Sequence, residues 1–188
     1  YEFSGVEPNP QYDTLMKAVE FAKDRDIDFL LAVGGGSVID GTKFIAAAMH
    51  YFGDPWDILT KSDVIKSAVP FASVLTLPAT GSEMNSGSVI SRTEPLQKRA
   101  FQSVHTFPTF SILDPTTTYS LPIKQVANGI VDAYTHTMEQ YLTYPVGGQI
   151  QDRFAESILQ TLIEVAPAQI ETPDNYPARA NFLWTATL

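Results

Sequence analysis

The chain has 188 residues, of which 44% are hydrophobic and 18% charged, the balance of a folded globular protein rather than a disordered one. Its net charge of −9, from 21 acidic and 12 basic residues, excludes the basic surface that a nucleic-acid partner requires. The sequence contains no cysteine, so disulfides are excluded and any metal site must use His, Asp or Glu.

Hydropathy indicates the cellular setting of the protein, and the two chain ends indicate whether the sequence is part of a longer polypeptide. No stretch approaches the roughly 20 apolar residues needed to span a bilayer, and the N-terminus carries no signal-peptide pattern, so we expect a cytoplasmic protein with no membrane partner. The chain starts at Tyr1-Glu2-Phe3 and finishes in an apolar helical run, residues 181–188, without a cap or stop signal. We therefore expect an internal segment of a longer polypeptide.

The first part of the chain is predicted to alternate helices and strands. A helix is expected over residues 11–25, with its buried face formed by Leu15, Val19 and Ala22. The continuous apolar run Phe29–Val33 predicts a strand that is buried on both faces, as in parallel sheets. Glycines 34–36 end this strand, and a helix is expected over residues 37–48.

Later segments change from strands to helices. Strands are predicted at 71–77 and 110–113, and two short strands, near 89–90 and 100–101, flank a turn at Glu94-Pro95. Helices are predicted over about 122–142, about 150–170 and from 177 onward. The pattern predicts an α/β domain with a parallel sheet, residues 1–115, followed by the start of an all-helical domain, residues 116–188.

The first chemical motif is Val33-Gly34-Gly35-Gly36-Ser37, between a strand and a helix. Glycines let backbone N–H groups approach a diphosphate closely, and a helix N-terminus turns partial positive charge toward an anion. Ser37 adds a hydroxyl donor and is the predicted N-cap of the helix. The motif predicts a nucleotide-phosphate site, and a tight turn without a ligand is the alternative.

The second motif is the small, polar loop Pro78–Glu83, which follows a predicted strand. Ligands of open parallel sheets bind outside the carboxyl ends of the strands, where the glycine motif is also expected. The hydroxyl groups of Thr76, Thr80 and Ser82 could donate to phosphate and ribose oxygens. The alternative is a loop whose hydroxyls bond only to its own backbone.

The third motif, Asn128–His136, places Asp132 and His136 four residues apart, so that both side chains leave one face of a helix. A carboxylate and an imidazole suit a divalent ion such as Fe, Zn or Mn, and Gly129 would let another group approach the helix closely. A surface hydrogen bond between Asp132 and His136 is the alternative. The other histidines, His50 and His105, have no such neighbour and are expected to be structural.

Five motifs follow one another along the chain: Gly5–Pro10, Gly34–Ser37 with Asp40, Pro78–Glu83, Leu113–Pro115 and Gly129-x-x-Asp132-x-x-x-His136. Their combination and order resemble those of the iron-containing alcohol dehydrogenase family. The resemblance covers essentially the whole chain and is closest to the butanol-dehydrogenase-like branch of NADPH-dependent aldehyde reductases. It implies a dehydroquinate-synthase-like fold, in which the α/β domain binds NAD(P)H and the helical domain binds one Fe or Zn ion.

The resemblance also implies roles for individual residues. Asp132 and His136 would be the first two metal ligands. The cofactor site would be formed by Asn9, Gly35, Gly36, Ser37, Asp40, Thr76, Thr80, Ser82, Lys98 and Leu113, with Lys98 near the ribose and phosphates. The implied cofactor is NADP(H) in preference to NAD(H), and the full-length protein is expected to be a homodimer that acts on a small aldehyde or alcohol.

Two features depart from the family pattern. The loop Pro78–Glu83 is shorter than in much of the family, although this form fits the butanol branch. The two further histidine ligands and the first strand of the cofactor domain, whose loop reads the adenosine ribose, are expected outside the chain. We therefore expect these 188 residues alone to be inactive.

The predicted reaction of the intact enzyme is reversible reduction of an aldehyde to a primary alcohol by hydride transfer from NAD(P)H, with the metal acting as a Lewis acid. No separate side-chain acid or base is predicted. One alternative is a non-catalytic nucleotide-binding module, in which Asp132 and His136 are incidental. Another is a related metal-dependent sugar-phosphate cyclase or glycerol-phosphate dehydrogenase, which would need more basic residues to hold a substrate phosphate.

Overall fold

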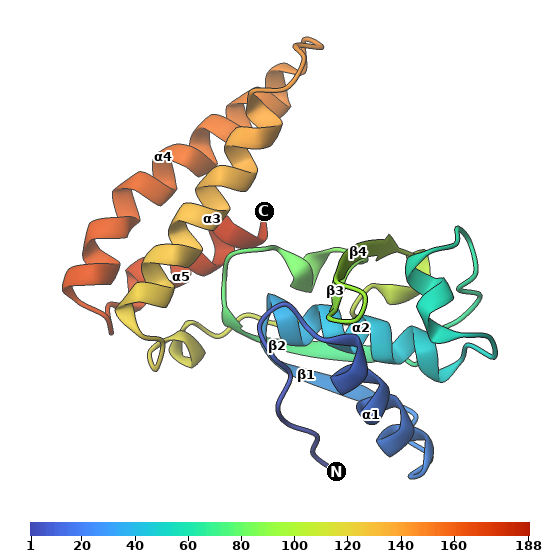
Figure 1. The fold of residues 1–188 in the computed structure, drawn as a ribbon. Coiled ribbons are helices and arrows are strands. Elements are labelled where there is room, and N and C mark those ends of the chain that lie inside the picture. The colour runs from blue at the N-terminus through green and yellow to red at the C-terminus, as the bar shows by residue number, and fades with distance from the viewer. The chain divides into compact units, whose positions relative to one another are not determined.

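The computed structural model describes all residues from Tyr1 to Leu188 (Figure 1). Its internal contacts divide the chain into two compact units. Unit 1 comprises residues 1–75 and 82–112, and unit 2 comprises residues 76–81 and 113–188. The short segment 76–81 thus belongs with the C-terminal unit, although in the sequence it lies between two parts of unit 1.

Unit 1 alternates helices with strands, as predicted. Its helices are α1 (Tyr12–Lys23) and α2 (Gly36–Met49). Its strands are β1 (Leu30–Gly35), β2 (Phe71–Leu77, the last two residues of which belong to unit 2), β3 (Gly87–Arg92), β4 (Gln97–Gln102) and β5 (Ser111–Ile112). Short 3-10 helices, η1 (Pro55–Leu59), η2 (Ser82–Met84) and η3 (Val104–Thr106), lie in the connections.

The main sheet has the strand order β1-β2-β5, and β2 pairs in parallel with β5, with Ser73 opposite Ser111. The predicted parallel sheet is therefore confirmed. The hairpin of β3 and β4 forms a separate antiparallel sheet, in which Ser91 lies opposite Lys98. Its turn falls at the predicted Glu94-Pro95.

Strand β1 differs from its prediction, because it is not buried on both faces. Ala32 is 1% exposed, but Leu31 is 56% and Val33 is 57% exposed. Alternate residues of a strand point to opposite faces, and β1 stands at the end of the strand order, where only some of its surface is covered. A continuous apolar run indicates that a strand is suited to burial, but it does not show that both faces are covered.

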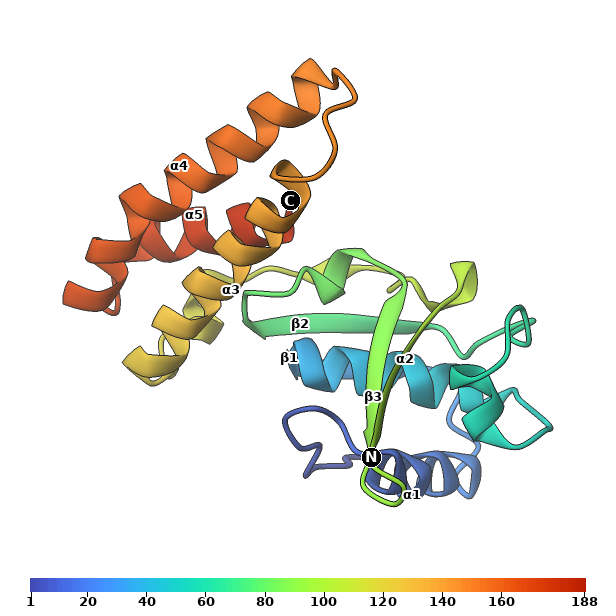
Figure 2. The same cartoon turned by 45° about the horizontal axis from the view of Figure 1, so that its top comes forward.

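Helix α2 lies at the centre of unit 1 and packs against β1, β3 and α1 (Figure 2). All eight residues from 41 to 48 are buried, which explains why small alanines occupy positions 46–48 near the end of the helix. The predicted apolar face of α1 is confirmed, since Leu15, Val19 and Ala22 are buried. The aromatic side chains of Tyr12, Phe44, Trp56 and Phe101 complete this core through edge-to-face contacts.

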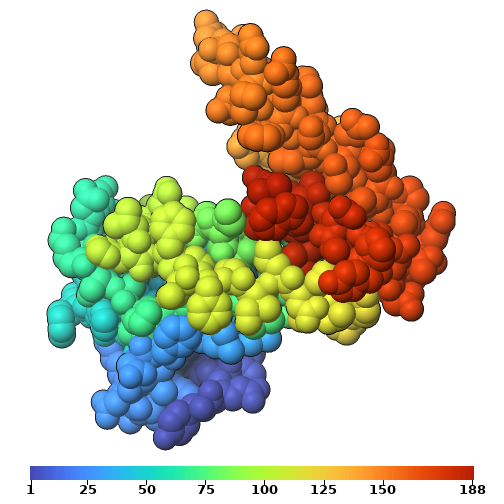
Figure 3. All heavy atoms as spheres, turned by 180° about the vertical axis from the view of Figure 1, so that it is seen from behind, coloured from blue at the N-terminus to red at the C-terminus, as the bar shows by residue number.

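Unit 2 is helical, as predicted. After the 3-10 helix η4 (Pro115–Thr118), it contains α3 (Ile123–Tyr141), α4 (Gln149–Glu171) and α5 (Tyr176–Thr187). Helices α3 and α4 form an antiparallel pair, and α5 packs against α4 (Figure 1). In Figure 3 the orange atoms of α4 and the red atoms of α5 lie side by side. The core of the unit is formed by Val126, Ile130, Ala133, Leu162 and Phe182. None of the helices has the combined length and hydrophobicity that crossing a bilayer requires.

Candidate cofactor and metal site

The glycine motif forms the turn from β1 into α2. Strand β1 ends at Gly35 and α2 begins at Gly36, so Gly35 is the N-cap, and no side chain caps the helix. The predicted N-cap role of Ser37 is wrong, because the helix starts before Ser37 and places that residue in its first turn. The first-turn amides therefore receive no acceptor from a capping side chain and carry the partial positive charge of a helix N-terminus.

Gly34 has a packing role that is separate from any ligand. A Cβ atom built on Gly34 would lie 2.6 Å from Cγ2 of Val38, which is too close for two carbon atoms. Gly34 thus allows α2 to turn back against the strand that precedes it. Gly35, Gly36 and Ser37 are all half-buried, so the turn is accessible at the point where the helix begins.

Asn9 and Lys98, 89 residues apart, are brought together in unit 1. Lys98 Nζ donates a hydrogen bond of 2.8 Å to Asn9 Oδ1, and both residues are exposed. The backbone supports this pair, because Ser91 N donates to Pro10 O at 2.9 Å and Ser91 lies opposite Lys98 in the hairpin. Asn9 has a φ of 56°, a left-handed conformation that asparagine tolerates better than most residues.

Asp40 and Ser82 belong to a polar network around the buried Lys43 that local sequence patterns do not indicate. Ser82 Oγ donates to Asp40 Oδ1, and Val89 N donates to Asp40 Oδ2 at 2.9 Å. Lys43, which is 0% exposed, donates to Ser82 Oγ at 3.0 Å. Burial raises the pKa of the Asp40 carboxyl above its usual value and lowers the pKa of the Lys43 ammonium to about 8. Both shifts arise because a buried site disfavours charge.

A signal for Lys43 was present in the sequence. Lys43 lies between Gly41-Thr42 and the apolar run Phe44–Ala48. The small and apolar residues around it leave no polar face of the helix on which a lysine would be expected. A lysine inside such a run must either extend to solvent or find several acceptors. The acceptors come from residues about 40 positions later, so the local pattern alone does not identify them.

In unit 2, the predicted loop after β2 packs against α3. A Cβ atom on Gly129 would lie 2.7 Å from the carbonyl oxygen of Pro78 and 3.4 Å from Cζ of Phe182. The close approach expected at Gly129 is therefore made by the loop itself. Thr80 is exposed and Thr76 half-buried, and Gly81 has a φ of 63°, which suits a glycine at the end of this short loop. Leu113 is half-buried at the start of the second stretch of unit 2.

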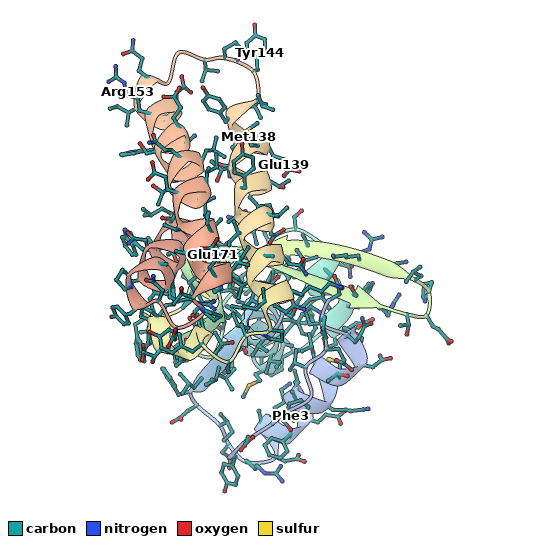
Figure 4. The ribbon with its side chains drawn as sticks, turned by 90° about the vertical axis from the view of Figure 1, so that its left-hand side faces the viewer. Phe3, Met138, Glu139, Tyr144, Arg153 and Glu171 are labelled. Carbon is teal, nitrogen blue, oxygen red and sulfur yellow. The ribbon has the colours of Figure 1, made fainter.

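Asp132 and His136 lie on one face of α3, as their spacing predicts. Asp132 Oδ1 and His136 Nε2 are 3.7 Å apart, and their side chains are 45% and 46% exposed. This distance exceeds that of a hydrogen bond, so the alternative of a hydrogen-bonded surface pair is not what the structure contains. Figure 4 shows the same helix with Met138 and Glu139 on it, Tyr144 in the connection that follows it, and Arg153 near the start of α4.

The donor set of this pair fits a transition metal, but two ligands do not complete a site. A carboxylate oxygen and an imidazole nitrogen on one accessible helix face are ligands that Fe and Zn accept. No group of three or more His, Asp or Glu residues that could hold an ion occurs in residues 1–188. Within this chain, therefore, Asp132 and His136 can supply only part of a coordination sphere.

Two family models match the chain. The model of the iron-containing alcohol dehydrogenase family matches residues 1–115, and the model of the C-terminal part of the Fe-containing alcohol dehydrogenase family matches residues 126–188. The chain belongs to the iron-containing alcohol dehydrogenase family. The resemblance found in the sequence motifs is thus confirmed over both the α/β and the helical parts.

Individual members of the family are similar to the chain over its whole length. The NADPH-dependent aldehyde reductase YqhD of Escherichia coli is 60% identical over 99% of this chain and 49% of its own length. The probable NADH-dependent butanol dehydrogenase 1 of Bacillus subtilis is 51% identical over 100% of this chain and 49% of its own. The chain thus spans about half the length of these relatives.

Solved structures of the family share the fold. The crystal structure of E. coli YqhD superposes with a TM-score of 0.96 at 59% identity, over 100% of this chain and 49% of that one. The NADH-dependent butanol dehydrogenase A of Thermotoga maritima gives a TM-score of 0.93 at 40% identity, over 100% of this chain and 47% of that one. The α/β unit followed by a helical unit is therefore the family's arrangement.

Proposed function

We propose that the full-length protein is a metal-dependent oxidoreductase that interconverts aldehydes and primary alcohols by hydride transfer with NAD(P)H. Family membership over both parts of the chain supports this proposal, as do the names of the relatives, which are an aldehyde reductase and butanol dehydrogenases. The observation that carries it is the Asp132–His136 pair, since both donor atoms lie on one accessible helix face 3.7 Å apart.

In the proposed assignment, residues 1–115 form the dinucleotide-binding domain and residues 116–188 begin the metal-binding domain. The first-turn amides of α2, at Gly36 and Ser37, would bind the cofactor pyrophosphate through their N–H groups and the helix dipole. Lys98 would add a positive charge near the ribose and phosphates, and its bond to Asn9 would hold its side chain in place. The family resemblance also assigns Thr76, Thr80 and Leu113 to the cofactor site.

Asp132 and His136 would hold one Fe or Zn ion together with ligands from outside this chain. When bound, the ion supplies a Lewis acid that polarises the substrate oxygen. The two side chains would fix where that oxygen binds, so the protein contributes orientation more than proton transfer. For the cofactor we propose NADP(H), because the 60% identical relative is named as NADPH-dependent, although the butanol dehydrogenases are named as NADH-dependent.

A steady-state assay of the full-length protein tests this function. Butyraldehyde reduction is followed with NADPH and with NADH, before and after dialysis against a chelator and after return of Fe²⁺ or Zn²⁺. We expect turnover that the chelator removes and the metal restores, with a higher kcat/KM for NADPH. Turnover that survives complete metal removal, or nucleotide binding without any turnover in metal-loaded protein, would contradict the proposal.

A further inference from the structure

Lys43 is fully buried, yet every hydrogen of its ammonium group has an acceptor. Lys43 Nζ lies 3.0 Å from Ser82 Oγ, 2.9 Å from Asn85 Oδ1 and 2.7 Å from the carbonyl oxygen of Gly87. A protonated lysine has three donors, and these three bonds use all of them. All three acceptors belong to one short segment, residues 82–87, which leads into β3.

The same face of α2 is bonded to β3 through Asp40. Val89 N donates to Asp40 Oδ2 at 2.9 Å, and Ser88 Oγ donates to the carbonyl oxygen of Asp40 at 2.8 Å. Ser82 Oγ, which accepts from Lys43, donates in turn to Asp40 Oδ1. The carboxylate also balances the charge of the ammonium, which an isolated buried lysine could not sustain.

These bonds connect the two parts of unit 1 that carry the proposed cofactor groups. One is the start of α2, where Gly36 and Ser37 offer their amides, and Asp40 and Lys43 lie one and two turns further along the helix. The other is the β3–β4 hairpin, in which Ser91 pairs with Lys98. The network therefore fixes the spacing between the helix N-terminus and the Lys98–Asn9 pair.

We propose that Lys43 is a positioning residue of the cofactor site, which acts by holding residues 82–89 against α2 through Ser82, Asn85 and Gly87. This inference rests on the proposed dinucleotide site, because Lys43 is 0% exposed and can influence a cofactor only through the residues that it holds. It differs from a general packing role because each of its bonds crosses from α2 to the segment that leads into the hairpin. Loss of Lys43 should move one set of cofactor groups relative to the other.

The test compares two substitutions in neighbouring residues of the full-length protein. Lys43→Met keeps the length and burial of the side chain but removes all three bonds. Thr42→Val is the matched control, because Thr42 is also buried and its hydroxyl donates only within α2, to the carbonyl oxygen of Val38 at 2.8 Å. NADPH affinity is measured by fluorescence titration of metal-free protein, and amide hydrogen exchange is measured over residues 82–89.

We expect Lys43→Met to raise the Kd for NADPH by about tenfold or more, the scale on which supporting contacts of a site act, and to speed amide exchange in residues 82–89. Thr42→Val should leave both within about twofold of wild type. If Lys43→Met does not fold, Lys43→Gln, which retains two donors without charge, should give an intermediate increase in Kd. Equal Kd values for the folded Lys43 variant and Thr42→Val would overturn the positioning role alone. A wild-type protein that binds neither NADPH nor NADH would instead contradict the proposed function.

Discussion

Gly129 of α3 lies directly against the backbone of Pro78, such that a Cβ atom on Gly129 would be 2.7 Å from the Pro78 carbonyl oxygen. This contact joins the loop that follows β2 to the helix that carries Asp132 and His136. Residues 76–81, which comprise the end of β2 and the first part of the loop, belong to unit 2 together with the helix. The absence of a side chain on Gly129 therefore allows the backbone of this loop to lie against the helix that carries the candidate metal ligands.

Substitution of this glycine should destabilise unit 2. In Gly129→Ala the new methyl group meets a backbone oxygen that cannot rotate away, and overpacking of this kind costs about 1–3 kcal/mol. The gain in helix propensity, about 1 kcal/mol, acts in the opposite direction. We expect a lower midpoint in thermal unfolding. The control is Asn128→Ala on the exposed neighbouring position, which should keep or raise the midpoint; a Gly129→Ala variant as stable as wild type would contradict the contact.

Lys43 should make stability depend on pH in the alkaline range. Its pKa is lowered by burial to about 8 from the usual 10.5, so between these values the unfolded chain binds more protons at this site than the folded chain. Stability contributed by this group therefore rises as pH increases from about 8 to about 10.5. The free energy of unfolding is measured for wild type and Lys43→Met at pH 7.5 and at pH 10. Relative to Lys43→Met, wild type should be more stable at pH 10 than at pH 7.5, by up to about 3 kcal/mol. A difference that stays constant or moves the other way would show that folding does not lower the pKa of Lys43.

Lys98 should contribute to cofactor binding through its charge. A charge-assisted hydrogen bond to a phosphate or ribose oxygen contributes about 1.5–3 kcal/mol, so Lys98→Met is expected to raise the Kd for NADPH roughly tenfold or more. Arg99→Met is the matched control, because Arg99 is adjacent, exposed and of the same charge, and its guanidinium donates to Gln97 of the same strand. Titration of both variants of the full-length protein measures this, and equal losses would mean that only the overall charge matters.

The 188-residue segment alone should have no catalytic activity. Asp132 and His136 have no third His, Asp or Glu close enough to complete a metal site in this chain, and two ligands hold Fe or Zn weakly. We expect no butyraldehyde reduction above the blank when the purified segment is supplied with NADPH and Fe²⁺ or Zn²⁺. Metal-dependent turnover by the segment would show that fewer ligands suffice.

Local features of the sequence predicted most of the elements. The strand at Phe71–Leu77 and the helix that carries Asp132 and His136 follow from apolar runs and helical spacing, because each depends on residues that are near in sequence. The same reasoning placed the N-cap at Ser37, whereas the extended backbone of Gly35 takes that position. Glycine can cap a helix without a side chain, so a serine two residues after it is a weak indication of where the helix begins.

The buried network could not be predicted from local patterns. Asp40 was assigned to the cofactor site by family resemblance, and its bonds to Val89 and Ser82 depend on residues more than 40 positions away. The burial of Lys43 likewise depends on the packing of α2 against residues 82–87, which are distant in the sequence. The exposure of Leu31 and Val33 is a further example, since it depends on what covers β1 and not on the hydrophobicity of the strand.

The most direct test of the proposed function is the metal content of the full-length protein. Wild type, Asp132→Ala and Glu139→Gln are loaded with Fe²⁺ or Zn²⁺, dialysed, and analysed by inductively coupled plasma mass spectrometry. Glu139 is an exposed acid on the same helix (Figure 4), so it controls for loss of charge. We predict close to one ion per chain in wild type and Glu139→Gln, and a large loss in Asp132→Ala. Equal metal content in all three proteins would contradict the assignment of Asp132 as a ligand.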